Sequence, residues 1–278
     1  MNEIWVFGPG ALGDTILTFP FLHKLQKKFS DKKIIFWGSA EYSTLVNEFF
    51  PSIEFRSFQS LTLLPIFSCD FSKQDLKINF PDRVFVILKK DKLIEKNLKE
   101  ICPHVHWCEI NEKENLWVGD QILRMLTDFK SDEFILKRQI SANTKILIHM
   151  GTGSPPKLLP NEFWDLLIKH LVNSYSVTLL YGPAEKKIPL EKIEGVEIIQ
   201  DISLKNLIQK MKEFNYYIGL DSGVSHLAGV LGLKGYAFFH YTNPILWHPM
   251  GQIKPIVVDK NNQSSWLPLL NSLLFANS

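Results

Sequence analysis

Short apolar runs alternate with segments of helical apolar spacing, and this alternation begins afresh near the middle of the chain. Residues 4–7 form an apolar run that ends at Gly8, and apolar residues then recur every three or four positions through a predicted helix. Pro20 is expected to kink this helix, because proline cannot donate to the carbonyl of the preceding turn. A second apolar run follows at residues 33–37, and the second half repeats the pattern from residue 146 onward. Strands that are joined by helices pair in parallel, so the alternation predicts an α/β fold with Rossmann-like sheets.

The restart at residue 146 indicates two domains. A chain of 278 residues can hold two domains of ordinary size, and 45% hydrophobic with 22% charged residues is typical of globular proteins. Residues 130–144 are polar and lack a clear period, which places a linker there. We therefore predict two doubly wound parallel sheets, one in residues 1–140 and one in residues 141–278. Ligands bind such sheets at the carboxyl ends of the strands, so the loops that follow strands are searched for site residues.

Charge and terminal composition restrict the partners. The formal net charge is only +2 and the basic residues are dispersed, so we expect no nucleic-acid partner. The first residues lack the basic segment and the cleavage site of a secretory leader, and no apolar run reaches the length of about 18 residues that suggests a membrane helix. These features predict a cytoplasmic protein.

The cysteines are expected to be free thiols. Cys69, Cys102 and Cys108 make an odd count, which a reducing compartment explains more simply than a disulfide framework. Two of these cysteines, with His104 and His106 between them, stand at every second position, in a pattern that suggests zinc. A strand would spread the four side chains too far along its length to surround one ion, so we predict a half-buried strand and no metal.

The first glycine loop carries an unusual acidic residue. Gly8, Gly10 and Gly13 keep the spacing of a dinucleotide-binding fingerprint, but Asp14 follows at the start of the predicted helix. A carboxylate there would repel a phosphate at the helix N-terminus. Two interpretations stay open from the residues alone: Asp14 has a chemical role, or it only complements the helix dipole.

A second loop follows the apolar run at residues 216–220. Asp221, Ser222 and Gly223 precede an apolar helix that contains His226. Ser222 can cap that helix, Gly223 allows a ligand to approach the backbone, and the exposed N–H groups could hold a pyrophosphate. The alternative is a capped helix in which His226 is simply part of the core.

A third loop gathers hydroxyls, glycine amides and a lysine after the apolar run at residues 146–149. Thr152, Gly153, Ser154 and Lys157 could form a phosphate clamp in which the lysine supplies a point charge. A flexible loop with a solvated lysine is the alternative. Gly182 ends another predicted strand and could line the same nucleotide pocket or form a plain turn.

Taken together, these segments resemble glycosyltransferase family 9, the heptosyltransferase family, whose members have the GT-B fold. Three blocks match in order and spacing: residues 10–15 with Thr18 and Pro20, residues 151–157, and residues 221–227. The loop at residues 181–185 also resembles a family block. The last block, Asp-Ser-Gly-Val-Ser-His-Leu, is the most specific. The matched blocks span both predicted domains, whereas residues 48–144 resemble nothing in particular.

The resemblance implies an inverting glycosyltransferase whose two Rossmann-like domains face a cleft. Asp14 is similar to the family's general base, and Lys157 is similar to its diphosphate-binding lysine. Gly10, Leu12 and Gly13 would then lie on the acceptor side, with Asp14 and Lys157 on opposite walls of the cleft. No cofactor or metal is implied, because a lysine and backbone amides can balance the charge of the leaving diphosphate.

The resemblance also implies substrates. The donor would be a nucleoside-diphosphate sugar, with ADP-heptose favoured, and the acceptor a lipopolysaccharide core or another surface glycan. A lipid-anchored acceptor would bring the enzyme to the inner membrane face as a peripheral protein. Residues 266–275 read as a final amphipathic helix, which in GT-B proteins packs back across the domain junction, and we favour that over a membrane contact.

One segment departs from the family pattern. Family members read Gly-Pro-Thr-Asp-Pro after the last core strand, whereas residues 240–244 read His-Tyr-Thr-Asn-Pro. This departure leaves open a non-catalytic relative that binds a sugar nucleotide. The spacing of Gly8, Gly10 and Gly13 leaves open an NAD-dependent oxidoreductase. The oxidoreductase would need an acidic residue near the end of the second strand, where Glu41 is only a distant candidate.

Overall fold

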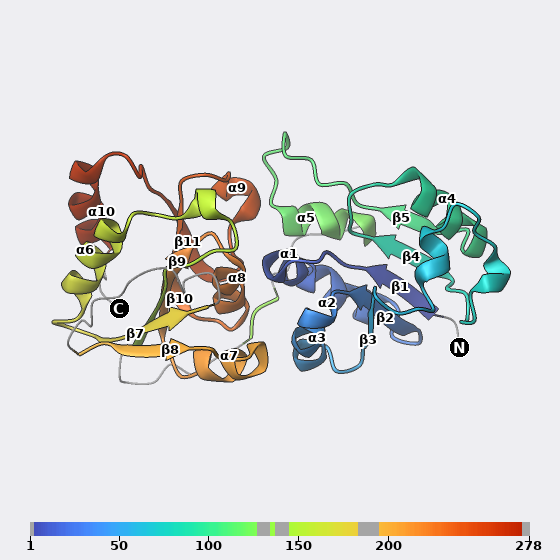
Figure 1. Cartoon of the computed structure of the whole chain (residues 1–278), viewed down its shortest axis with the longest axis horizontal. Helices are drawn as coiled ribbons and strands as arrows, with labels where there is room; N and C mark the ends of the chain where they lie inside the picture. The colour runs from blue at the N-terminus through green and yellow to red at the C-terminus, as the bar shows by residue number, and fades with distance from the viewer. Residues whose placement is uncertain (1–2, 127–133, 137–144, 183–194, 274–278) are drawn as a thin grey trace. The chain divides into compact units, whose positions relative to one another are not determined.

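The computed structural model describes residues 3–126, 134–136, 145–182 and 195–273, and the chain divides into two compact units, Met1–Phe134 and Ile135–Ser278 (Figure 1). Each unit contains one parallel sheet. The structural division falls six residues before the sequence-based boundary at residue 140, inside the polar segment that was predicted to be the linker. Most of that segment lies outside the described residues.

The first unit is built on a five-stranded sheet of order β3-β2-β1-β4-β5. Its strands are β1 (Glu3–Phe7), β2 (Lys33–Gly38), β3 (Glu54–Ser57), β4 (Arg83–Val86) and β5 (Val105–Trp107), and every neighbouring pair is parallel. The chain leaves β1 for β2 and β3 and then returns to the other side of β1 for β4 and β5. This reversal next to β1 confirms the predicted doubly wound sheet.

Helices cover both faces of this sheet, and they were only partly predicted. They are α1 (Leu12–Leu17), α2 (Phe19–Lys28), α3 (Ser43–Phe49), α4 (Lys92–Ile101) and α5 (Val118–Leu123). The helix expected to kink is broken between α1 and α2 at Thr18, and Pro20 lies in the first turn of α2, where its missing N–H costs no hydrogen bond. The sequence pattern missed α3 and α4, and Asp91 caps α4 by accepting from the amides of Leu93 and Ile94.

Aromatic side chains fill the core of the first unit. Trp5 packs edge-on against Trp37 with ring centroids 5.4 Å apart, and both indoles are fully buried. Gly8 follows β1 and lies directly beside the ring of Phe36, so that a Cβ there would overlap the ring. The first glycine of the loop is therefore required by core packing.

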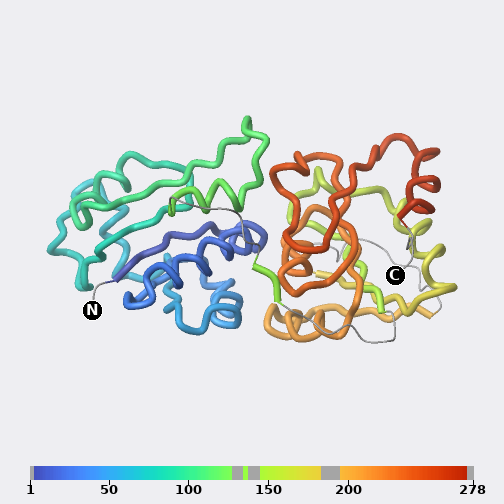
Figure 2. Tube along the Cα trace, turned by 180° about the vertical axis from the view of Figure 1, so that it is seen from behind, coloured from blue at the N-terminus to red at the C-terminus, as the bar shows by residue number. Residues whose placement is uncertain are grey.

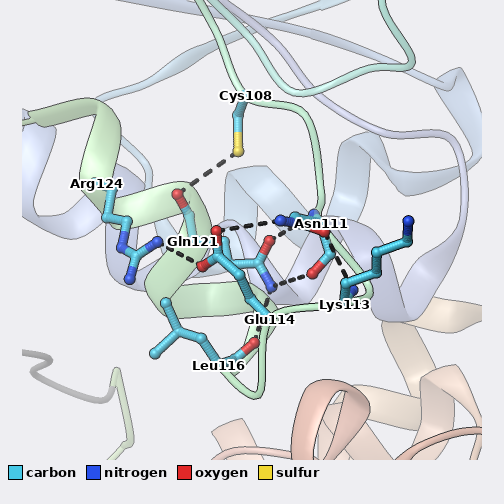
Figure 3. Close-up of polar contacts among 7 residues, drawn as sticks. All are labelled: Cys108, Asn111, Lys113, Glu114, Leu116, Gln121 and Arg124. Carbon is cyan, nitrogen blue, oxygen red and sulfur yellow. Dashed lines mark hydrogen bonds and ion pairs between the residues drawn. The ribbon is translucent and has the colours of Figure 1, made fainter.

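A buried amide organises the loop between β5 and α5 (Figure 3). The Gln121 side chain accepts from the amide of Asn111 at 2.7 Å and donates to the carbonyls of Leu116 at 2.8 Å and Asn111 at 3.3 Å. On the outside of the same loop, Arg124 contacts Glu114 at 2.6 Å. Gln121 is nearly fully buried, so these backbone bonds replace water for both the side chain and the loop.

The second unit is built on a six-stranded sheet of order β11-β10-β9-β6-β7-β8, again with parallel neighbours. Its strands are β6 (Lys145–His149), β7 (Ser176–Tyr181), β8 (Glu197–Gln200), β9 (Tyr216–Leu220), β10 (Lys234–Phe239) and β11 (Gln252–Val257). Its helices are α6 (Asn161–Leu171), α7 (Leu204–Met211), α8 (Gly223–Val230), α9 (Pro244–Trp247) and α10 (Trp266–Leu273). Figure 2 shows the trace of each unit from behind, with the strands and helices of the second unit coloured from yellow-green to red.

The final helix, α10, packs within the second unit. Trp266 and Leu270 are buried in a core cluster that also contains Phe163, whose ring meets Trp266 edge-on at 5.5 Å. The hydroxyl of Tyr236 donates to the carbonyl of Leu273 at 2.8 Å. The prediction that this helix also packs back onto the first domain concerns a contact between the two units, and it stays a prediction.

Within the described part of the chain, the helices are all too short or too polar to traverse a lipid bilayer.

Candidate functional site

The order of the second sheet reverses between β6 and β9, and the loops after these two strands therefore lie next to each other. In an open α/β sheet this reversal is where a crevice forms at the carboxyl ends of the strands. Residues 150–159 follow β6, and Asp221 and Ser222 follow β9. Two of the loops that were singled out in the sequence are thus brought to one place.

An ion pair links these loops. The ammonium of Lys157 lies 2.6 Å from Oδ2 of Asp221. Only 6% of the Asp221 side chain is exposed, compared with 23% of the Lys157 side chain. The hydroxyl of Thr242, in the loop after β10, donates to the same Oδ2 atom. A buried carboxylate thus collects a lysine and a hydroxyl from its two neighbouring loops.

Ser222 occupies the N-cap position of α8, but its hydroxyl makes no capping bond. It faces Nδ1 of His149 at 3.5 Å and Oγ of Ser225 at 3.5 Å. The predicted capping role is therefore wrong at the level of the side chain, because β6 brings His149 within reach of the hydroxyl. The turn is held instead by Ser225, which is fully buried, donates to the carbonyl of Leu220 and meets the hydroxyl of Tyr217 at 3.0 Å.

His226 lies in the first turns of α8 and is almost completely buried. Burial lowers its pKa from 6.5 to about 4, with the charges of Lys157 and His248 acting in the same direction and the Asp221 carboxylate opposing them. The ring is therefore neutral at physiological pH. Within the part of the chain that the structure describes, its Nδ1 atom is buried without a hydrogen-bond partner.

The remaining candidates of the second unit lie around the same loops. The Thr152 hydroxyl donates to the carbonyl of Asp221 at 3.4 Å and accepts from the amide of Ser154 at 3.4 Å. Gly153 is exposed, and a Cβ added there would meet no atom within 4 Å. Gly182 follows β7, which pairs with β6, and is half-buried. Gly223 begins α8 and is also half-buried. The rest of the 181–185 block lies outside the described residues.

The first unit holds the other candidates at the corresponding edge of its sheet. Asp14 lies in the first turn of α1, directly after the glycine loop that ends β1, and is half-buried. Gly10 is exposed, with open space where a Cβ would lie, and Leu12 and Gly13 are half-buried. Tyr42 comes close from the loop after β2, and its pKa is raised by burial, with contributions from nearby carboxylates that include Asp14.

The structure thus joins the candidates into two groups, one in each unit. Asp14 and Lys157 belong to different units, so their placement on facing walls stays a prediction. Sequence reasoning missed the participation of Thr242, His149, Ser225 and Tyr42. All four lie at or just after strand ends, or in the turn that follows, so a wider search of those positions could have found them. Across the described residues, no group of three or more His, Cys, Asp or Glu is placed to hold a metal ion.

Comparison with known proteins identifies related chains. The model of glycosyltransferase family 9 (heptosyltransferase) matches residues 120–267, which is more than half of the chain. Lipopolysaccharide heptosyltransferase 1 of Campylobacter coli is 26% identical over 197 residues, covering 66% of this chain. The match spans 54% of that relative's length.

Solved structures share the fold. A family 9 glycosyltransferase from Veillonella parvula superposes with a TM-score of 0.73 at 18% identity, covering 98% of this chain and 92% of that one. The ADP-heptose lipopolysaccharide heptosyltransferase II of E. coli gives a TM-score of 0.72 at 14% identity, covering 98% and 97%. These likenesses establish the GT-B type of fold, with two parallel-sheet α/β domains. With the family model matching from residue 120 through the Lys157, Asp221 and Thr242 loops, the chain belongs to glycosyltransferase family 9, the heptosyltransferases.

Proposed function

We propose that this protein is an inverting glycosyltransferase that moves a heptose, or a related sugar, from a nucleoside-diphosphate donor to a surface glycan. ADP-heptose is the proposed donor, and a lipopolysaccharide core the proposed acceptor. The observation that carries the proposal is the Lys157–Asp221 pair at the reversal point of the second sheet, inside the segment that matches the family model.

The second unit supplies groups that suit a diphosphate. Lys157 offers a partly exposed positive charge, and Gly153 leaves open space beside the backbone. The first amides of α8, near Gly223, have no partners within the helix and favour an anion. We assign Thr152, Ser154 and Gly182 to the wall of the nucleotide pocket.

The first unit supplies the base in this proposal. A sugar hydroxyl is a weak nucleophile, and a carboxylate that takes its proton during attack speeds the step. Asp14 would accept that proton as the acceptor oxygen bonds to the anomeric carbon of the donor. The bond from that carbon to the diphosphate breaks at the same time, and the nucleoside diphosphate leaves with the electron pair. Lys157 stabilises the charge that develops on it.

The proposed surroundings follow from the acceptor. A lipid-anchored glycan core would place the enzyme in the cytoplasm with a peripheral contact at the inner membrane face. We assign no cofactor, since the nucleotide sugar is consumed as a substrate. The acceptor-side positions proposed are Gly10, Leu12 and Gly13, which precede Asp14 in the sequence.

The oxidoreductase alternative is less well supported. Strand β2 ends at Gly38, and Glu41, the nearest acidic residue, is exposed in the short turn that follows. The residues at the strand end, Gly38 and Ser39, carry no carboxylate that could hold a dinucleotide ribose there.

Ligand-dependent melting separates the classes. Purified protein is heated with ADP, UDP, GDP or NAD, and ADP is expected to give the largest increase in Tm. A ligand at 100 times its Kd adds about 2.7 kcal/mol to the free energy of unfolding. An increase with NAD and none with any nucleoside diphosphate would overturn the proposal.

A transfer assay then tests catalysis. Incubation with ADP-heptose and a lipopolysaccharide-core acceptor should yield ADP and a product heavier by one heptose, measured by mass spectrometry. Lys157→Ala should weaken ADP binding, whereas Lys169→Ala, at an exposed position on α6, should not. Binding of ADP without transfer to any acceptor tested would favour the non-catalytic relative.

A further inference from the structure

Thr242 and Lys157, the lysine of the proposed diphosphate site, contact the same carboxylate oxygen of Asp221. The Thr242 hydroxyl donates to Oδ2 of Asp221, the atom that Lys157 contacts at 2.6 Å. The three residues follow β10, β9 and β6, which are neighbours in that order in the sheet. Asp221 therefore sits between two donors that come from opposite sides.

The two donors differ in how firmly they are held. Thr242 directly precedes Asn243, which begins α9 by accepting from the amide of Ile245 at 3.0 Å, and Leu246 anchors that helix in the core. Lys157 ends a three-residue turn, and its long side chain is partly exposed. The hydroxyl is thus fixed beside the carboxylate, whereas the ammonium can turn away.

Movement of the lysine has an electrostatic consequence for Asp221. A buried carboxylate that loses its only partner is strongly destabilised, because neither water nor protein balances the charge. If a diphosphate draws Lys157 away from Asp221, this penalty weakens the binding of the diphosphate. A hydroxyl that stays bonded to Oδ2 reduces the penalty.

We propose that Thr242 is a positioning residue that keeps Asp221 hydrogen-bonded while Lys157 transfers from the carboxylate to the donor's diphosphate. In the empty site Lys157 pairs with Oδ2 of Asp221, and in the loaded site Thr242 keeps its hydrogen bond to that oxygen. Thr242 acts through Asp221 and Lys157 and is not itself a diphosphate ligand. This inference rests on the proposed function, because it requires a nucleoside diphosphate at Lys157.

The test compares Thr242→Val with Thr242→Ser. Valine keeps the shape and removes the hydroxyl, so the Kd for ADP, measured by titration calorimetry, should rise roughly tenfold or more, as expected for loss of a hydrogen bond to a charged group. Serine should restore the affinity to near the wild-type value. The KM for the sugar nucleotide should follow the Kd, with a smaller change in kcat. Thr62→Val, at an exposed threonine of the first unit, is the matched control and should change nothing.

A double-mutant cycle separates the loss of this hydrogen bond from a general effect of the valine on the fold. In an Asp221→Asn background the side chain at position 221 is neutral, and no buried charge is left without a partner. Thr242→Val should therefore no longer alter ADP affinity. Equal ADP affinity in wild type and Thr242→Val, a Thr242→Ser variant as weak as Thr242→Val, or additive effects in the cycle would each overturn the role of Thr242. A wild-type protein that binds no nucleoside diphosphate would overturn the proposed function as well.

Discussion

Asp14 is the residue on which the proposed chemistry depends most. It lies in the first turn of α1, half-buried, where the sequence alone allowed either a chemical role or simple complementation of the helix dipole. Asp14→Asn keeps the shape and removes the base, so turnover should fall by about 10²- to 10⁴-fold while the Kd for ADP stays unchanged. The measurement is steady-state transfer alongside calorimetry.

Asp31→Asn provides the control for Asp14, because Asp31 is an exposed carboxylate of the same unit. It should leave transfer and binding intact. Undiminished transfer by Asp14→Asn would remove Asp14 as the base and leave the dipole interpretation. Loss of ADP binding in the same variant would place Asp14 at the donor instead.

His226 should make the protein sensitive to acid. Its pKa is lowered from 6.5 to about 4 by burial, so between these pH values the unfolded chain binds a proton that the folded chain refuses. The contribution of neutral His226 to stability is therefore complete above pH 6.5 and is lost as the pH falls toward 4. The loss amounts to about 3 kcal/mol, at about 1.4 kcal/mol per pKa unit.

Urea unfolding at several pH values measures this effect. The free energy of unfolding of wild type should decrease more between pH 6.5 and 4 than that of His226→Gln, which cannot titrate. His170→Gln, at an exposed site, should follow the wild-type curve. His106 also has a lowered pKa through burial, so part of the slope should persist in the His226 variant. Identical slopes for His226→Gln and wild type would contradict the assignment.

The candidate residues were largely predictable, but their partners were not. Glycine, serine, threonine and lysine directly after apolar runs marked the loops that follow β6 and β9 without any structure. The bond from Thr242 to Asp221 depends on β10 lying beside β9, and the contact of Ser222 with His149 depends on β6 lying on the other side. Strand order is a long-range property that local patterns do not contain.

At the scale of elements, the loop between β5 and α5 shows how one buried amide can replace regular structure (Figure 3). Gln121 makes its hydrogen bonds to the backbone of Asn111 and Leu116. Gln121→Leu should lower the free energy of unfolding by about 1–3 kcal/mol, because the buried backbone groups lose their partners. Chemical denaturation measures the change, and Gln59→Leu at an exposed site is the control. An unchanged midpoint for Gln121→Leu would mean that water replaces the amide.

The central strands were predicted from their apolar runs, whereas helices α3 and α4 were missed. The central strands of both sheets are continuous apolar runs and are buried, as parallel strands should be. Helix α4 begins in a lysine-rich segment, yet its spacing buries Asn97, Leu98 and Ile101. The burial of Asn97 was not predicted, because its amide donates to the carbonyls of Ile66 and Ser68, which are distant in the sequence.

At the scale of the whole molecule, each unit has its own sheet, its own reversal of strand order and its own core. Trp5 and Trp37 belong to a core cluster of the first unit, whereas Phe163 and Trp266 belong to one of the second. The proposed donor contacts, Lys157 and Asp221 among them, all fall in the second unit. A bound donor nucleotide should therefore stabilise the second unit more than the first.

Hydrogen exchange detects this asymmetry. Amides open locally with different free energies, and a bound ligand slows exchange most in the segments that it contacts. With saturating ADP, exchange should slow most in the loops after β6, β9 and β10 and in the first turn of α8. Strands β1 to β5 should change less. Lys157→Ala at the same ADP concentration should lose most of the protection, because fewer molecules are occupied. The greatest protection around Gly8 to Gly13 would place the nucleotide on the first unit's glycine loop, as an NAD-type enzyme requires, and would reverse the assignment of donor and acceptor units.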